Sequence, residues 1–119
     1  MPVYMTQFAY APEAWDALVT HPEDRGRVLA SHLERLGGRL ICFYYAFSEY
    51  DGLAIYEVPS DTVAAAAVMA IAAPGHDKAL RTTPLLTVEQ AMEAMTQARG
   101  ARYRPPMARA DDWQPYGDG

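Results

Sequence analysis

Hydrophobic positions recur along the chain in two ways, as short β-forming runs and at the 3.6-residue spacing of helices. Four runs predict strands, over residues 3–10, 39–47, 52–59 and 76–86. The turn at 48–51 has about the length of a hairpin loop, so the second and third strands are expected to pair. Pro84 cannot donate a ladder hydrogen bond, which is typical of an edge strand or a strand end.

The segments between these runs carry helix signals. Pro12 suits the first turn of a helix, which Thr20-His21-Pro22 interrupts. After Pro22 a second helix is predicted, with Glu23 and Asp24 in its first turn and Gly37-Gly38 at its end. Its apolar stripe consists of Val28, Leu29, His32, Leu33 and Leu36.

Two further helices begin at residues that can cap them. Ser60 can cap a helix through the alanine-rich segment 61–73, which Pro74-Gly75 ends. Thr87 and Gln90 form a capping box that opens a last helix to about Arg99. From Gly100 the chain is rich in Pro, Arg and Asp and is expected to be extended.

The element order is β-α-β-β-α-β, followed by a helix and a tail, which predicts an α+β ferredoxin-like fold. Residues 1–99 are expected to form a single domain, and residues 100–119 an extended tail. In this fold both crossing helices cover one face of the antiparallel sheet. An apolar face left bare is seldom tolerated by a soluble monomer, so two sheets are expected to pack face to face in a homodimer.

The stretches "YMTQFAYAPEAW", "LGGRLICFYYAFSEYD", "LAIYEVPSDTVAAAA", "RTTPLLTVEQAMEAM" and "YRPP" together resemble the GYD domain family, which is named for a Gly-x-Tyr-Asp turn. The resemblance runs from about Tyr4 to Pro106, with Ser48 in the place of the turn glycine. It implies pairing as a dimeric α/β barrel and brings no settled reaction.

Composition excludes several classes of function. The net charge is −5 and Lys78 is the one lysine, which argues against binding nucleic acid or an anionic membrane surface. Cys42 is the single cysteine, so no internal disulfide or Cys-based zinc site can form. The apolar run 63–73 is too short to span a bilayer, and residues 1–8 lack signal-peptide features. No glycine-rich nucleotide loop is present, so no cofactor is expected. A cytoplasmic location is expected as well.

The aromatic hairpin 43–59 supplies the candidate ligand site. Strand alternation places Cys42 and Tyr44 on one face and Ile41, Phe43 and Tyr45 on the other, where they are expected to pack on the helices. The predicted ligand-binding residues are Gln7, Tyr10, Tyr44 and Glu57, with Tyr44 and Glu57 facing a cavity between paired sheets. Gln7 either points into that cavity or bonds a neighbouring loop or the partner subunit.

Glu57 and His32 are the candidate catalytic residues. A carboxylate facing an apolar cavity can act as a general base; alternatively, Glu57 meets water or Arg81 at a strand end. His32 lies on the apolar helix stripe, where most histidines are core or interface residues. The Tyr50-Asp51 pair of the turn is interpreted as structural.

The leading hypothesis is a small-molecule-binding homo-oligomer, with a pocket between sheet and helices or between paired sheets. Any reaction would be a cofactor-free proton transfer or oxygenation. The rival is a non-catalytic oligomerisation module with a filled barrel. The helix at 61–73 has almost no polar face, which favours a second interface and assemblies larger than a dimer.

Overall fold

The computed structural model describes residues 1–106. The chain divides into two units, Met1–Leu85 and Leu86–Gly119, and each is described by itself. The first unit contains β1 (Val3–Tyr10), α1 (Pro12–Thr20), α2 (Arg25–Arg35), β2 (Arg39–Tyr45), β3 (Gly52–Glu57), α3 (Asp61–Ala72) and β4 (Asp77–Leu85). The second contains α4 (Val88–Gly100).

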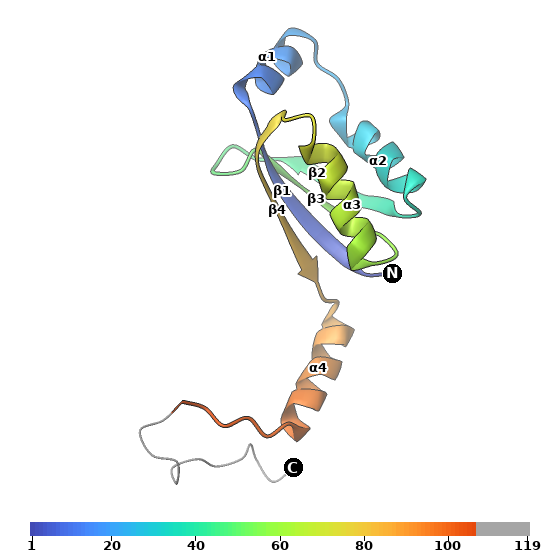
Figure 1. The fold of residues 1–119 in the computed structure, drawn as a ribbon, viewed down its shortest axis with the longest axis vertical. Coiled ribbons are helices and arrows are strands. Elements are labelled where there is room, and N and C mark those ends of the chain that lie inside the picture. The colour runs from blue at the N-terminus through green and yellow to red at the C-terminus, as the bar shows by residue number, and fades with distance from the viewer. Residues whose placement is uncertain (107–119) are drawn as a thin grey trace. The chain divides into compact units, whose positions relative to one another are not determined.

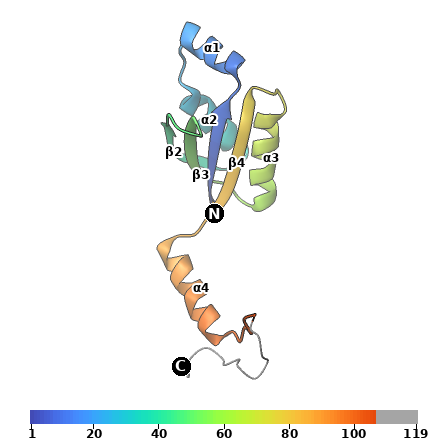
Figure 2. The same ribbon diagram turned by 90° about the vertical axis from the view of Figure 1, so that its left-hand side faces the viewer.

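The strands of the first unit form one antiparallel sheet in the order β2-β3-β1-β4 (Figure 2). Helices α2 and α3 both lie against the same face of this sheet (Figure 1). The predicted α+β ferredoxin-like fold is therefore confirmed. Strand β4 lies at an edge, where Pro84 lacks a backbone donor at little cost.

The helix starts follow from side-chain caps. Ser60 accepts from the Val63 amide at 3.3 Å and caps α3, and Thr87 and Gln90 form the predicted capping box of α4. Helix α2 differs from the prediction, because the Asp24 carboxylate accepts from the Arg27 amide at 3.0 Å. Asp24 is thus the cap that precedes the helix and not a residue of its first turn.

Register assigns the two faces of the sheet. Tyr4, Ala54 and Tyr56 belong to the core under the helices, together with Leu33 and Val58, which are completely buried. Opposite residues of paired strands point to the same face. The other face, which we call the helix-free face, consists of Val3, Met5 and Gln7 of β1, Leu53, Ile55 and Glu57 of β3, Arg39, Cys42 and Tyr44 of β2, and Arg81, Thr83 and Leu85 of β4.

A β-bulge in β2 corrects one sequence prediction. The register shifts between Leu40 and Cys42, so Ile41 has no partner in β3 and is exposed. Leu40, not Ile41, packs against the core with Phe43. Strict alternation failed here because one extra residue reverses the side-chain direction upstream of it.

The Tyr4 hydroxyl donates a hydrogen bond to the Asp61 carboxylate, which joins β1 to the first turn of α3. This bond raises the pKa of Tyr4 to about 12, because an ionised tyrosine would lose it and meet the carboxylate. An unfolded tyrosine ionises near pH 10.0, so the stabilisation is full below that pH and is lost as the pH rises to about 12.

Tyr4→Phe is therefore expected to lower the urea midpoint at about pH 8. As the pH rises, the stability of the wild type should fall more than that of the variant. The gap between the two midpoints narrows between about pH 10 and about pH 12. Tyr50→Phe, which removes a hydroxyl from the turn between β2 and β3, outside the helix-free face, is the control and should leave the midpoint unchanged. A gap that stays constant with pH would contradict the role of this bond.

Helix α4 contains no buried residue, and Val88, Met92 and Met95 are among its exposed side chains. Residues 101–106 follow it without regular secondary structure. The remainder of the predicted tail, 107–119, lies outside the described residues. Within the described part, no helix has the length and hydropathy needed to cross a membrane.

Candidate functional site

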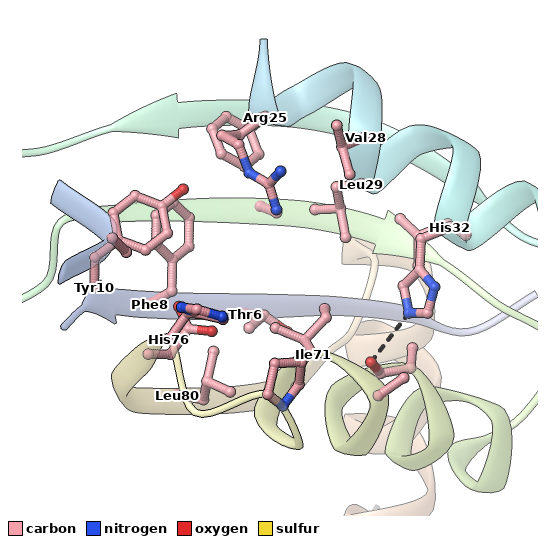
Figure 3. Close-up of a pocket in the computed structure, with 18 of the residues that line it drawn as sticks. Thr6, Phe8, Tyr10, Arg25, Val28, Leu29, His32, Ile71, His76 and Leu80 are labelled. Atoms are coloured by element: carbon pink, nitrogen blue, oxygen red, sulfur yellow. Dashed lines mark hydrogen bonds between the residues drawn. The ribbon is translucent and has the colours of Figure 1, made fainter. Parts of the chain in front are cut away.

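A pocket of about 620 Å³ lies between the helix-covered face of the sheet and helices α1, α2 and α3. Figure 3 shows Thr6 and Phe8 on its sheet side and Val28, Leu29 and Ile71 reaching in from the helices. All of its lining residues belong to the unit Met1–Leu85. The pocket opens to solvent, since Ala17 and Ala70 on its wall are exposed.

Its walls are largely apolar. The sheet contributes Phe8 and Phe43, whose rings stack with centroids 5.3 Å apart. Leu29 and Ile71 contribute aliphatic surface from α2 and α3. An apolar cleft of this size with a few polar groups has the usual make-up of a small-molecule site.

Two hydroxyls in the middle of the pocket already have partners. Thr6 Oγ1 lies 2.8 Å from the Tyr56 hydroxyl and 2.9 Å from Thr82 Oγ1. These bonds join β1 to β3 and β4 and satisfy polar groups that burial would otherwise leave unpaired. Thr6 and Tyr56 therefore stabilise the sheet and do not need a ligand.

His32 lies on the pocket wall and links two helices. Its Nε2 is 3.1 Å from the Ala67 carbonyl of α3, as the dashed line in Figure 3 shows. A carbonyl oxygen only accepts, so Nε2 carries the proton of this bond. In the neutral ring, Nδ1 is then an acceptor.

The other titratable side chains that line the pocket are Tyr10, His21, Glu23, Arg25, Arg35, His76 and Asp77. Burial and a hydrogen bond to Tyr45 raise the pKa of Tyr10, so its hydroxyl keeps its proton and can donate. Burial also raises the pKa of the Asp77 carboxyl, partly countered by the positive charge of Arg25. Arg25, Asp77 and His76 all line the pocket. We call Tyr10, Arg25, His76 and Asp77 the polar end of the pocket, because Arg25 affects the ionisation of Tyr10 and Asp77, and His76 affects that of Asp77.

The structure separates the sequence-predicted site residues. Tyr10 and His32 line the pocket, whereas Gln7, Tyr44 and Glu57 lie on the helix-free face. There, Gln7 pairs with Leu53 and Arg81, and Tyr44 pairs with Leu53. The five residues therefore do not form a single site.

Glu57 forms an ion pair that the sequence prediction did not name. Its carboxylate is 2.5 Å from Nε of Arg39, its cross-strand partner, and not beside Arg81. Arg81 lies opposite Gln7, in a different row of the sheet. The Arg39 contact gives Glu57 a partner at the strand end, in line with the structural alternative for this residue.

Arg25 and Asp77 were not predicted as site residues. They lie far apart in the sequence, at the start of α2 and of β4. No short motif connects them, and only the packing of α2 over the sheet brings both to the pocket. The sequence could have indicated them only through their shared position at the start of an element. That position becomes informative once the topology is known.

Asp51 of the turn has a structural role, as the sequence interpretation held. Its carboxylate accepts from the Tyr10 amide at 2.8 Å and from Trp15 Nε1 at 3.1 Å. Its own amide donates to the Phe8 carbonyl at 2.8 Å. Asp51 thus ties the β2–β3 hairpin to the corner between β1 and α1, which holds Tyr10 at the pocket.

No group of three or more His, Cys, Asp and Glu side chains arranged to hold a metal ion occurs within residues 1–106. A comparison with protein families found that a model described as the GYD domain matches residues 4–95. Comparisons with curated proteins and with solved structures found no match.

Proposed function

The chain belongs to the GYD domain family, and from this starting point we propose that it is a homo-oligomer that binds a small, largely apolar organic molecule in the pocket between the sheet and the helices. The observation that carries the proposal is the pocket of about 620 Å³ itself. Ligand sites commonly have volumes of about 300–1,000 Å³ and apolar walls with a few polar groups at one place.

The arrangement of hydrogen bonds supports binding more directly than a reaction. Thr6 is paired with Tyr56 and Thr82, and His32 is bonded through Nε2 to the Ala67 carbonyl. These groups hold the walls of the pocket in place. A preformed wall lowers the ordering cost of binding, which favours affinity for a ligand of matching shape.

The helix-free face supports the homo-oligomer. Its centre carries Met5, Leu53 and Ile55, which are only partly buried within a single chain. Exposed tyrosine at Tyr44 extends this apolar surface to the β2 edge. We propose that a second copy covers the face, with the two sheets packed against each other.

Helix α3 supports a second contact between copies. Ala65, Ala66 and Met69 are exposed on it, and small side chains permit close helix approach. We propose that this surface joins dimers into larger assemblies. A light-scattering mass that never exceeds that of a dimer, at any concentration, would refute the α3 contact.

Filling the pocket from α3 should weaken ligand binding. Ala70 is exposed at the wall, so Ala70→Phe places a ring in the cavity without displacing core residues. We expect it to weaken binding of the uncharged fluorophore N-phenyl-1-naphthylamine by at least about tenfold, which fluorescence titration measures.

Ala94→Phe is the matched control. Ala94 is an exposed alanine of helix α4 and does not line the pocket. Its fluorophore affinity should equal that of the wild type. Equal binding by both variants would place the fluorophore elsewhere, and no binding to the wild type would refute the proposed function.

A further inference from the structure

Arg25 is oriented toward the space in which the ligand is proposed to bind. It lies at the first position of α2, and Figure 3 shows its guanidinium pointing into the cavity. Its Nη1 forms an ion pair at 2.9 Å with the carboxylate of Glu23, which also lines the pocket. Both side chains of that pair are well exposed, so the contact is weak and easily exchanged.

Tyr10 and Asp77 share this end of the pocket with Arg25. Arg25 lies near enough to affect the ionisation of both groups. Nevertheless, the ion pairs found among residues 1–106 do not include one between Arg25 and Asp77. All three side chains line the pocket, so part of a ligand in the pocket can reach them.

The chemistry of the three side chains indicates which group fits this space. A guanidinium presents several N–H donors in a plane that matches a carboxylate. Either hydroxyl of the Tyr10–Tyr45 pair can donate, so with Tyr45 as the donor the Tyr10 hydroxyl has its own proton available for a ligand. Asp77 is the carboxyl group of this end; burial raises its pKa, and the positive charge of Arg25 opposes that rise.

We propose that the ligand carries a carboxylate beside its apolar body, and that Arg25 binds this carboxylate while the body occupies the cleft between Phe8, Phe43, Leu29 and Ile71. This inference rests on the proposed function and narrows its ligand to an amphipathic organic acid. Tyr10 donates a second hydrogen bond to the carboxylate. Arg25 is then a residue that determines specificity and not a catalytic one.

The test compares two competitors that share one ring system and differ in a single substituent, an anionic carboxylate or an uncharged carboxamide. Bound N-phenyl-1-naphthylamine is displaced with 2-naphthoate or with its uncharged amide, 2-naphthamide. We expect 2-naphthoate to displace it at a concentration about tenfold lower, since a charge-assisted hydrogen bond to a partly exposed arginine gives an advantage of about this size. Added salt should narrow the difference.

Arg25→Gln should remove the advantage of 2-naphthoate and leave 2-naphthamide unchanged. Arg27→Gln is the matched control, because Arg27 is an exposed arginine of the same helix that does not line the pocket. Asp77→Asn should strengthen 2-naphthoate about threefold by removing a carboxylate that repels it. Undiminished fluorophore binding shows that each variant is folded.

Two results would overturn the inference while leaving the proposed function intact. One is that the acid and the amide displace the fluorophore equally well from the wild-type protein, although Ala70→Phe weakens fluorophore binding. The other is an acid preference that survives Arg25→Gln. Failure of the fluorophore to bind at all would instead refute the proposed function on which the inference rests.

Discussion

Ile55→Lys is expected to convert the proposed homodimer into a monomer. Ile55 lies at the centre of the helix-free face, between Met5 of β1 and Cys42 of β2. In the proposed dimer an ammonium at this position would be buried against the partner sheet without a counter-charge, and its two-fold copy would be buried as well. We expect the dissociation constant of the dimer to rise at least about 100-fold.

Light scattering or sedimentation at micromolar concentration measures this change. Val19→Lys is the control, since Val19 is an exposed apolar residue of α1 outside the helix-free face. It should leave the mass unchanged. A wild-type protein that is monomeric at micromolar concentration would refute the dimer, and an Ile55→Lys protein that stays dimeric would move the interface to another surface.

Gly38→Ala is expected to destabilise the fold by about 3 kcal/mol or more. A Cβ atom at Gly38 would lie 2.2 Å from the Glu57 carbonyl oxygen and 2.6 Å from Val58 Cγ1. The first neighbour is backbone of the central strand β3, and Val58 is completely buried. Relief would require β2 to move away from β3, which breaks ladder hydrogen bonds. Urea denaturation monitored by circular dichroism measures the loss.

Gly75→Ala separates this clash from ordinary glycine effects. Gly75 has φ of +80°, but a Cβ atom there would meet nothing within 4 Å. Its substitution should cost only the strain of a left-handed backbone, about 1–2 kcal/mol. If the two variants lose the same stability, then close approach of β2 and β3 does not explain the requirement for Gly38.

Local signals in the sequence were sufficient for most of the fold. Ser60 and Thr87 cap their helices through bonds with residues three positions further on, so the whole interaction lies within a short segment. Pro84 indicated an edge strand because its missing donor is a property of the residue alone. The order of elements then left few topologies, and the ferredoxin-like one was observed.

The candidate site depended on longer-range geometry. Strand alternation indicated that Glu57 and Tyr44 point to one face of the sheet, but the pocket lies on the opposite face. Ile41 was misplaced because alternation counts residues and cannot detect a bulge. Arg25 was missed because no local pattern connects it with Tyr10 and Asp77, while the structure places all three around the pocket.

The sequence by itself determined which segments form strands and helices, which residues cap them, and that one face of the sheet is apolar and uncovered by helices. These properties depend on residue type and on spacing of a few positions along the chain. Only the tertiary structure decided that α2 and α3 leave a pocket above the sheet and that Arg25, Tyr10 and Asp77 all line it. A cavity is the space left between packed elements, and its volume depends on distances between segments that no local pattern specifies.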